Sequence, residues 1–260
     1  MKNYIASLFK TKNSENRLYL IDFLRGFTII NMILYHAVWD MVYLLDFNIP
    51  WFKGNPGFIW QQAICYSFIL ISGFCINLSK NGFKGGIVVF ICGIIVSAVT
   101  FLFMPENSIL FGILTFLGSA MIVTVLFIKP LKRVNSFVGL IINILLFIIL
   151  RHLNDGYIGL YDIFTVQIPV FLYNGYFASF IGFTDKSFIS ADYFSILPWI
   201  FLFLTGYYFG RIVKIEEKGK EYGFLKMKIP ILNYIGQHSL IIYLVHQPIL
   251  YVFTLIYNSL

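Results

Sequence analysis

Four ionisable residues lie in one apolar stretch near the N-terminus: Asp22, Arg25, His36 and Asp40 occur within RLYLIDFLRGFTIINMILYHAVWDMVYLL. A helix advances by about 100° per residue, so all four side chains fall on one stripe about 60° wide. The stripe must face protein or water, because charged groups are costly in hydrocarbon. It forms two polar pairs, Asp22 with Arg25 and His36 with Asp40, about 16 Å apart along the helix axis.

The pair His36 and Asp40 has the residue types of a general base and its partner. A carboxylate one helical turn away can accept a hydrogen bond from one ring nitrogen and stabilise imidazolium. The other nitrogen is then free to take a proton from a hydroxyl or an amine. We interpret both residues as catalytic; the alternative is that they only bond to neighbouring helices. Asp22 and Arg25 are interpreted as an i,i+3 ion pair, with ligand contact as the second interpretation.

The last apolar stretch, LNYIGQHSLIIYLVHQPILYVF, carries a second polar face. Ser239, Tyr243 and His246 fall within about 60° of one another on a helix. Ligand contact and hydrogen bonding between helices explain this face equally well. Pro248 predicts a kink just after His246 that would expose backbone groups.

Two further polar residues lie in apolar surroundings. Ser72 stands beside Gly73 in FILISGF, which favours close helix packing over a catalytic role. Asp192, at the start of DYFSILPWIFLFL, is predicted to cap the helix that follows it. Contact with an acceptor substrate is the alternative for Asp192.

The elements that position these residues are membrane spans. Of the 260 residues, 59% are hydrophobic and 12% are charged, and the mean hydropathy is +0.81, which indicates a polytopic membrane protein. The net charge of +7 does not require nucleic acid, because cytoplasmic loops collect Lys and Arg. Cys65, Cys75 and Cys92 lie in apolar segments, so we predict neither a disulfide framework nor a metal site.

The predicted fold is an all-α transmembrane bundle that forms a single membrane domain over residues 1–260. The expected spans are 19–45, 57–79, 85–104, 108–128, 136–150, 191–211 and 235–258. The segment 163–182 is apolar but interrupted by Gln167 and Pro169, so we expect a re-entrant or capping segment there.

The distribution of basic residues predicts the orientation. With the N-terminus inside, fifteen of the nineteen Lys and Arg lie on the cytoplasmic side and three on the other. We therefore place the protein in the cell membrane as a multi-pass protein, with the N-terminus in the cytoplasm and the C-terminus extracytoplasmic. One crossing within 151–190 would move the basic loop 211–228 outside, so zero or two crossings are expected there.

Several segments, taken in order, resemble one known group. They are similar to segments of the heparan-alpha-glucosaminide N-acetyltransferase-like membrane family, which is related to acyltransferase family 3. The segments are RLYLIDFLRGFTIINMILYHAVWD, FILISGF, DYFSILPW with LTGYYFG, and GQHSLIIYLVHQPIL. The resemblance implies transfer of an acyl group, acetyl above all, from cytoplasmic acyl-CoA to a hydroxyl or amine of an extracytoplasmic sugar or glycan. His36 would be the catalytic base or a transient acyl carrier. Thr115 stands where related sequences often carry a histidine. We therefore do not assign a second functional polar group to the predicted span 108–128.

The donor implied by the resemblance has charged phosphates and a long neutral pantetheine arm. We expect basic residues near the cytoplasmic face to hold the phosphates and polar groups further in to contact the arm. The candidates are Arg25, Asp22, Lys132, Arg133, Ser72, Tyr243 and His246. The expected partners are acyl-CoA, the glycan acceptor and membrane lipid; whether the chain forms a homo-oligomer is left open. The alternative function is a proton-coupled transporter in which His36, Asp40 and His246 relay protons, and the third is a structural scaffold.

Overall fold

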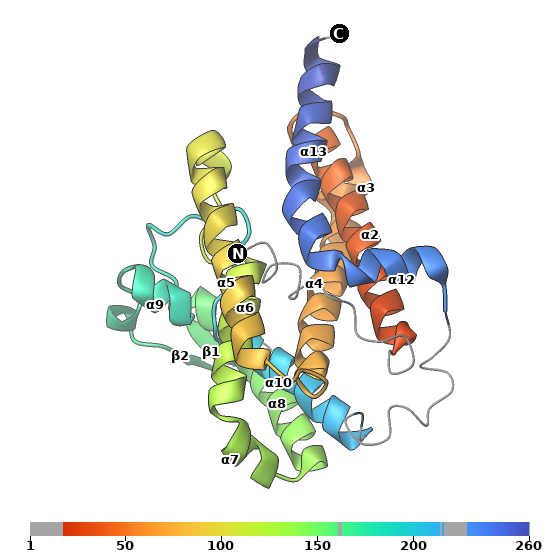
Figure 1. The fold of residues 1–260 in the computed structure, drawn as a ribbon. Helices are drawn as coiled ribbons and strands as arrows, with labels where there is room; N and C mark the ends of the chain where they lie inside the picture. Colours follow the sequence, from red (N-terminus) through yellow and green to blue (C-terminus); the bar gives the residue numbers. More distant parts are fainter. Residues whose placement is uncertain (1–17, 161–162, 214, 216–227, 260) are drawn as a thin grey trace. The chain divides into compact units, whose positions relative to one another are not determined.

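The computed structural model describes residues 18–160, 163–213, 215 and 228–259 (Figure 1). The chain divides into two compact units. Unit 1 comprises Met1–Ile64 and Glu217–Leu260, and unit 2 comprises Cys65–Glu216. The N-terminal basic residues and most of the basic loop predicted at 211–228 lie outside the described residues.

Unit 1 contains the two long helices that carry the ionisable residues. Its helices are α2 (Tyr19–Tyr43), α3 (Pro50–Lys53), the first half of α4 (Asn55–Ile76), α12 (Pro230–Gln237) and α13 (Ser239–Ser259). α2 packs against both α12 and α13, and Figure 1 shows α13 running beside α2. The first and last helices of the described residues therefore build this unit together.

Glycine allows α2 and α12 to touch along their backbones. A Cβ atom on Gly236 would lie 1.8 Å from the carbonyl oxygen of Asp22, and one on Gly26 would lie 2.0 Å from that of Leu232. Neither distance is sterically allowed, so both positions require glycine. α12 ends at Gln237 and α13 begins at Ser239, whereas the last span was predicted to begin at residue 235.

Unit 2 is a second helical assembly with a small β-hairpin. Apart from the segment between α8 and α10, its described helices are the remainder of α4, α5 (Gly82–Phe103), η2 (Pro105–Asn107), α6 (Ile113–Leu126), α7 (Ile128–Arg133), α8 (Ser136–Leu150) and α10 (Trp199–Ile212). α5 packs on α6, and α8 packs on α10. Gly73 of α4 meets the backbone of α10 so closely that a Cβ atom would lie 1.9 Å from the carbonyl oxygen of Phe203. The packing role predicted around Ser72 and Gly73 is thus confirmed for the glycine.

Among the described residues, five helices are long and apolar enough to cross a membrane: α2, α4, α5, α8 with the turn that follows it, and α13. α6 and α10 occupy the remaining two predicted spans, but each has only 14 residues. Fourteen residues rise about 21 Å, which is shorter than the roughly 30 Å of bilayer hydrocarbon. The count of seven spans therefore remains a prediction.

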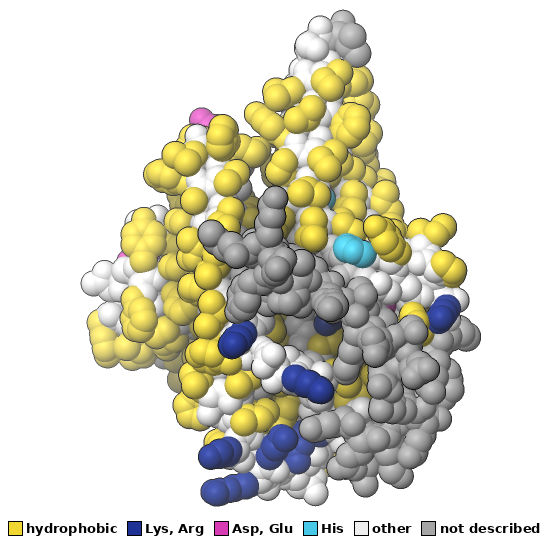
Figure 2. All heavy atoms as spheres, viewed as in Figure 1, with side chains coloured by type: hydrophobic (Ala, Val, Ile, Leu, Met, Phe, Trp, Pro, Cys, Tyr) yellow, Lys and Arg dark blue, Asp and Glu magenta, His cyan; other side chains and the backbone are white. Residues whose placement is uncertain are grey.

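Apolar side chains cover the visible sides of the spanning helices. Figure 2 shows hydrophobic residues along α5 and α13. On α5 these include Ile91, Ile94 and Ile95, and on α13 Val252 and Phe253, all of which are exposed. Exposed aliphatic surface on this scale is what lipid-facing helices require.

The segment between α8 and α10 is built from short elements, and we call residues 153–198 the cap. It contains η3 (Leu153–Asp155), β1 (Tyr157–Leu160), β2 (Phe164–Gln167), η4 (Val170–Leu172) and α9 (Tyr176–Ile181). The two strands pair antiparallel. The chain is mostly helical as predicted, but the all-α prediction is wrong here, because alternating residues in YIGL and FTVQ suit a hairpin. The re-entrant or capping role expected for residues 163–182 stays a prediction.

Asp192 caps a different helix from the one predicted. Its Oδ2 atom accepts a hydrogen bond of 3.1 Å from the backbone N–H of Ile113, the first residue of α6. α10 begins only at Trp199. The carboxylate therefore joins the cap to the start of α6. The two residues are 79 positions apart, so no local sequence pattern reveals the contact.

Asp185 holds together the loop that follows α9. Its carboxylate accepts hydrogen bonds from the backbone N–H groups of Gly175 (2.7 Å) and Ser187 (2.8 Å) and from the Ser187 hydroxyl (2.6 Å). These bonds, that from Gly175 first, lower the pKa of Asp185 to about 2. The carboxylate's contribution to cap stability is therefore present above the ordinary pKa of 3.8 and is lost as the pH falls toward 2.

Replacing Asp185 with alanine is expected to speed amide hydrogen exchange over residues 175–188 at neutral pH, because three hydrogen bonds are lost together. Hydrogen exchange measured by mass spectrometry checks this. Lys186→Ala is the matched control in the same loop, because no hydrogen bond of its side chain occurs within the described residues. Equal exchange in the two variants would mean that Asp185 does not order the loop.

Candidate active site between α2 and α13

Two histidine rings meet where α13 packs on α2. The ring centroids of His36 and His246 are 5.0 Å apart, and the ring planes are tilted by 55°. His36 lies in the second half of α2 and is half-buried, whereas only 8% of His246 is exposed. The structure thus joins the polar stripe of the first span to that of the last.

The hydrogen bonds of His246 define which of its nitrogens is available. Nδ1 donates to the backbone carbonyl of Tyr243 at 2.5 Å, because a carbonyl can only accept. In the neutral ring Nε2 is then the acceptor. Nε2 is buried and has no hydrogen-bond donor within the described part of the chain. His246 is therefore oriented with a free lone pair in the interior.

Asp40 is held by α13 and not by its own helix. Only 2% of Asp40 is exposed, and its Oδ1 atom accepts a hydrogen bond of 3.0 Å from Nε2 of Gln247. Oδ2 of Asp40 and Oε1 of Gln247 are buried without a hydrogen-bond donor among the described residues. A buried polar group without a partner costs about 1–3 kcal/mol.

Together these residues place three unpartnered acceptor atoms on two adjoining helices: Nε2 of His246, Oδ2 of Asp40 and Oε1 of Gln247. Acceptors of this kind suit a bound molecule that supplies N–H or O–H groups. The neighbouring imidazole of His36 adds a group with ring nitrogens that can accept or donate a proton. The arrangement can therefore bind a donor group and exchange a proton with it.

Aromatic rings pack beside His36. Tyr35 lies 5.0 Å from Phe52 and 5.4 Å from Trp60, measured between ring centroids. The indole N–H of Trp60 donates to Oδ1 of Asn31 on α2 at 3.2 Å. These contacts hold α3 and the start of α4 against α2.

The predicted pairings within α2 are corrected by these contacts. His36 and Asp40 do not hydrogen-bond to each other within the described residues, because the carboxylate points to Gln247 and the imidazole lies against His246. Asp22 and Arg25 are likewise not paired with each other among the described residues: Asp22 is buried on the part of α2 that α12 covers, whereas Arg25 is partly exposed. The prediction that the stripe faces protein is confirmed for Asp22 and Asp40.

The remaining candidate residues divide between the two units. Tyr243 belongs to the histidine cluster, with its ring 5.4 Å from that of His246. Ser72, Lys132 and Arg133 belong to unit 2, where Ser72 is half-buried on α4 and the two basic residues are exposed in the last turn of α7. Figure 2 shows Lys and Arg side chains around α7.

Arg211 ties the end of α7 to α10. Its guanidinium donates to the backbone carbonyls of Leu131 (2.9 Å), Lys132 (3.1 Å) and Val134 (3.2 Å). Arg211 thereby supplies hydrogen-bond donors to backbone carbonyl groups at the C-terminus of α7, which have no partner within the helix. The side chains of Lys132 and Arg133 are left directed to solvent.

Gln247 is the residue that the sequence interpretation missed. It lies about 100° from His246 on the helix, outside the stripe formed by Ser239, Tyr243 and His246. The available signal was an amide side chain in the middle of an apolar span, which usually has a hydrogen-bond partner. The packing of α13 on α2 brings both His246 and Gln247 to the interface.

Comparison with known proteins places this geometry in a family. No curated protein and no solved structure matches the chain. The family model described as heparan-alpha-glucosaminide N-acetyltransferase, catalytic, matches residues 17–248, which include α2 and the part of α13 that carries His246 and Gln247. The chain therefore belongs to the heparan-alpha-glucosaminide N-acetyltransferase catalytic family.

Proposed function

We propose that this protein is a multi-pass membrane acetyltransferase that moves the acetyl group of cytoplasmic acetyl-CoA to a hydroxyl or amine of an extracytoplasmic sugar. Family membership supports acetyl transfer to a glucosamine-type acceptor. The observation that carries the assignment of the site is the contact of His36 with His246 beside a buried Asp40, with three unpartnered acceptor atoms around them.

In this proposal His36 is the catalytic base. Its imidazole accepts the proton of the acceptor hydroxyl or amine while that group attacks the thioester carbonyl. The carbon–sulfur bond then breaks, and the imidazolium returns the proton to the departing sulfur. His36 could instead carry the acetyl group on a ring nitrogen between two half-reactions. The proximity of a second histidine is compatible with both routes.

His246, Asp40 and Gln247 orient the reactants around His36. Nε2 of His246 and the free oxygens of Asp40 and Gln247 accept hydrogen bonds, and the pantetheine arm carries amide N–H groups that can donate them. Tyr243 forms the aromatic neighbour of His246.

The phosphates of the donor require cations at the cytoplasmic face. Arg25 lies about 16 Å from His36 along α2, a distance that an extended pantetheine arm covers. Lys132 and Arg133 are exposed in unit 2 and are the second group of candidates. Asp22 and Ser72 are proposed as further contacts.

Acetyl transfer by the purified protein tests the function. Protein in lipid nanodiscs is incubated with radiolabelled acetyl-CoA and with glucosamine or a glucosamine-containing disaccharide, and labelled sugar is separated from free acetate. Labelled sugar is the expected product. Denaturing the protein before acceptor is added, and then removing all acetyl-CoA, separates the two routes, because only a covalently acetylated histidine keeps the label on the protein. Absence of both sugar labelling and acetyl-CoA hydrolysis contradicts the proposal.

The donor is expected to raise the melting temperature of the protein in a salt-dependent way. Acetyl-CoA binds the folded state, and its phosphate contacts are partly exposed and hence screened by salt. The shift should be smaller in Arg25→Ala and in Lys132→Ala/Arg133→Ala. Lys84→Ala is the control for removal of an exposed cation on α5. No shift at millimolar acetyl-CoA with folded protein would contradict the donor assignment.

The orientation predicts which positions can be labelled from outside. A single cysteine at Asn55 or Asn154 should react with a membrane-impermeant maleimide in intact cells, and one at Ser79 only after permeabilisation. The native Cys65, Cys75 and Cys92 are first replaced by serine or alanine. Labelling at Ser79 in intact cells would reverse the orientation and, with it, the side from which the donor is bound.

A proton-coupled transporter is the second candidate. Buried titratable side chains on α2 and α13 would also suit a proton relay. Such a protein would acidify or alkalinise proteoliposomes in the presence of its substrate and would not cleave acetyl-CoA. Acetyl-CoA turnover by purified protein therefore separates the two functions.

A further inference from the structure

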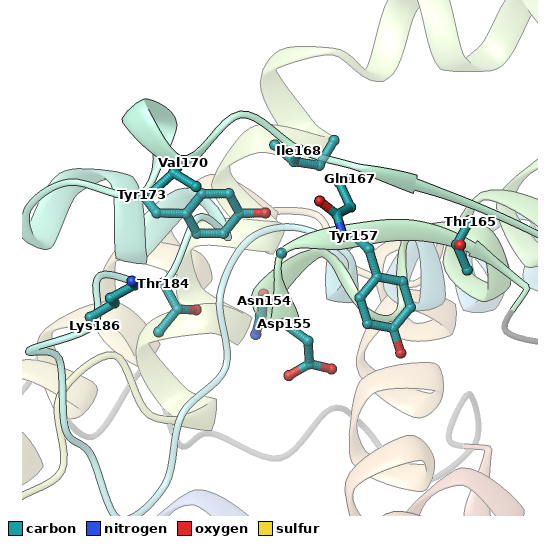
Figure 3. Close-up of a pocket in the computed structure, with 11 residues that line it drawn as sticks. Asn154, Asp155, Tyr157, Thr165, Gln167, Ile168, Val170, Tyr173, Thr184 and Lys186 are labelled. Carbon is teal, nitrogen blue, oxygen red and sulfur yellow. The ribbon is translucent and has the colours of Figure 1, made fainter.

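The cap contains a cavity that the proposed chemistry does not use. It has a volume of about 460 Å³ and lies entirely within unit 2 (Figure 3). No residue that lines it belongs to α2 or α13. Cavities of about 300–1,000 Å³ are the usual size for small-molecule sites.

One face of the hairpin forms a wall of this cavity. Tyr157 pairs with Gln167, and Gly159 pairs with Thr165, so these residues share one face. The cavity is lined by Tyr157, Thr165 and Gln167 from that face. The intervening residues of β2, Phe164 and Val166, alternate to the other face, where both are exposed.

The opposite wall comes from the chain that returns over the hairpin. Figure 3 shows Tyr173, Thr184 and Lys186 across the cavity from Tyr157 and Thr165. The hydroxyl of Tyr173 donates to the backbone carbonyl of Leu153 at 2.6 Å, which fixes its ring. Tyr157 stacks on His152 with ring centroids 4.9 Å apart.

The polar groups of the lining match a ligand that both donates and accepts hydrogen bonds. The side chains of Thr165, Gln167 and Lys186 have no hydrogen-bond partner within the described residues. A threonine hydroxyl and a glutamine amide each offer donors and acceptors. These three side chains are exposed and therefore available to a ligand. Sugar hydroxyls have the same double character, whereas lipid chains have neither donors nor acceptors and would form no hydrogen bonds with them.

Two further properties narrow the ligand class. Asp155 and Lys186 are the charged residues of the lining and have opposite signs, so the cavity does not select an anion such as phosphate. Two tyrosine rings provide apolar faces against which the C–H groups of a sugar ring can pack.

The loop that carries Thr184 and Lys186 is ordered before any ligand binds. Asp185 lies between them and accepts the hydrogen bonds from Gly175 and Ser187 described above. Asn154, another lining residue, accepts a hydrogen bond of 3.1 Å from Ser195. A site held in this way loses little conformational entropy on binding.

We propose that the cap cavity is a carbohydrate-binding site for one or two neutral sugar units. Gln167, Thr165 and Lys186 bond to hydroxyl groups, and the rings of Tyr157 and Tyr173 pack on the sugar. That this sugar belongs to the acetyl acceptor rests on the proposed function; the binding itself does not.

Saturation-transfer NMR with the full-length protein tests the site. The protein is held in nanodiscs prepared without maltoside or glucoside detergents, because their head groups are themselves sugars. Cellobiose, lactose and N,N′-diacetylchitobiose are the probes, and acetyl-CoA is omitted. Transfer of saturation to ring protons of at least one disaccharide is the expected result.

Two variants of β2 make the test specific. Gln167→Leu removes the amide and keeps the size of the side chain, and affinity is expected to fall about fivefold for loss of one or two neutral hydrogen bonds. Val166→Ala changes the other face of the same strand and should leave affinity unchanged. His36→Ala should still bind the sugar, since His36 is no part of the cavity.

The outcomes separate this inference from the proposed function. No saturation transfer to any of the three probes, or transfer that survives unchanged in Gln167→Leu and Thr165→Val combined, overturns the sugar site. Equal losses in Gln167→Leu and Val166→Ala also overturn it, because the hairpin fold rather than the cavity would then be responsible. Sugar binding without acetyl transfer would contradict only the enzymatic proposal.

Discussion

Replacing His36 with alanine is expected to lower acetyl transfer by about 10²–10⁴-fold, the usual contribution of a general base, while the protein remains folded. If His36 carries the acetyl group, the loss should be larger still. His36 is half-buried and within ring contact of His246, so alanine removes the imidazole without uncovering a large core. Initial rates with saturating acetyl-CoA and acceptor measure the effect.

Two variants guard this result against a folding artefact. His36→Gln retains hydrogen-bonding capacity but cannot act as a base, and should be as inactive as His36→Ala. His238→Ala is the matched control, because His238 lies at the end of α12 and its ring bonds only to the carbonyl of Tyr234 within the described chain. Near-normal turnover in both His36 variants, with an unchanged melting temperature, would assign His36 a structural role.

Replacing Gln247 with leucine is expected to reduce turnover about tenfold, because Asp40 would lose the hydrogen bond that orients it. Asp40→Asn should also reduce turnover while leaving donor binding in place, since it removes charge and keeps the shape of the side chain. If Gln247 acts through Asp40, the double variant Asp40→Asn/Gln247→Leu should be no slower than Asp40→Asn alone. Turnover numbers for all four proteins complete the cycle.

Gln237→Leu provides the control for this cycle, since it removes the same amide from the last residue of α12. Additive losses in the double variant would show that Gln247 and Asp40 act independently. A higher KM for acetyl-CoA with an unchanged kcat would instead make Gln247 a binding residue.

Much of the helical framework follows from the sequence because lipid demands long apolar runs. α2 was predicted at 19–45 and forms Tyr19–Tyr43, and α8 was predicted at 136–150 and forms Ser136–Leu150. Length, hydropathy and a polar neighbour at each end are local properties, so they can be read from a short window. The burial of Asp22 and Asp40 could also be predicted, because both lie on one stripe of the helix that cannot face lipid.

The partners of the site residues could not be predicted by local reasoning. A helical projection orders side chains around one axis but does not say which other helix lies against it. Asp40 was therefore assigned to His36, four residues away, although its partner is Gln247, 207 residues away. The hairpin was missed for a related reason: four residues such as FTVQ are too short to distinguish a strand from part of an interrupted membrane segment.

The pairing of α2 with α13 also means that the two helices are synthesised at different times. α2 leaves the ribosome first, and the Gln247 that bonds Asp40 follows 207 residues later, a delay of about 10–40 s at 5–20 residues per second. During that interval nascent α2 carries a carboxylate and a histidine that α13 does not yet cover. The insertion machinery must therefore keep this helix close to water or protein until the last one arrives.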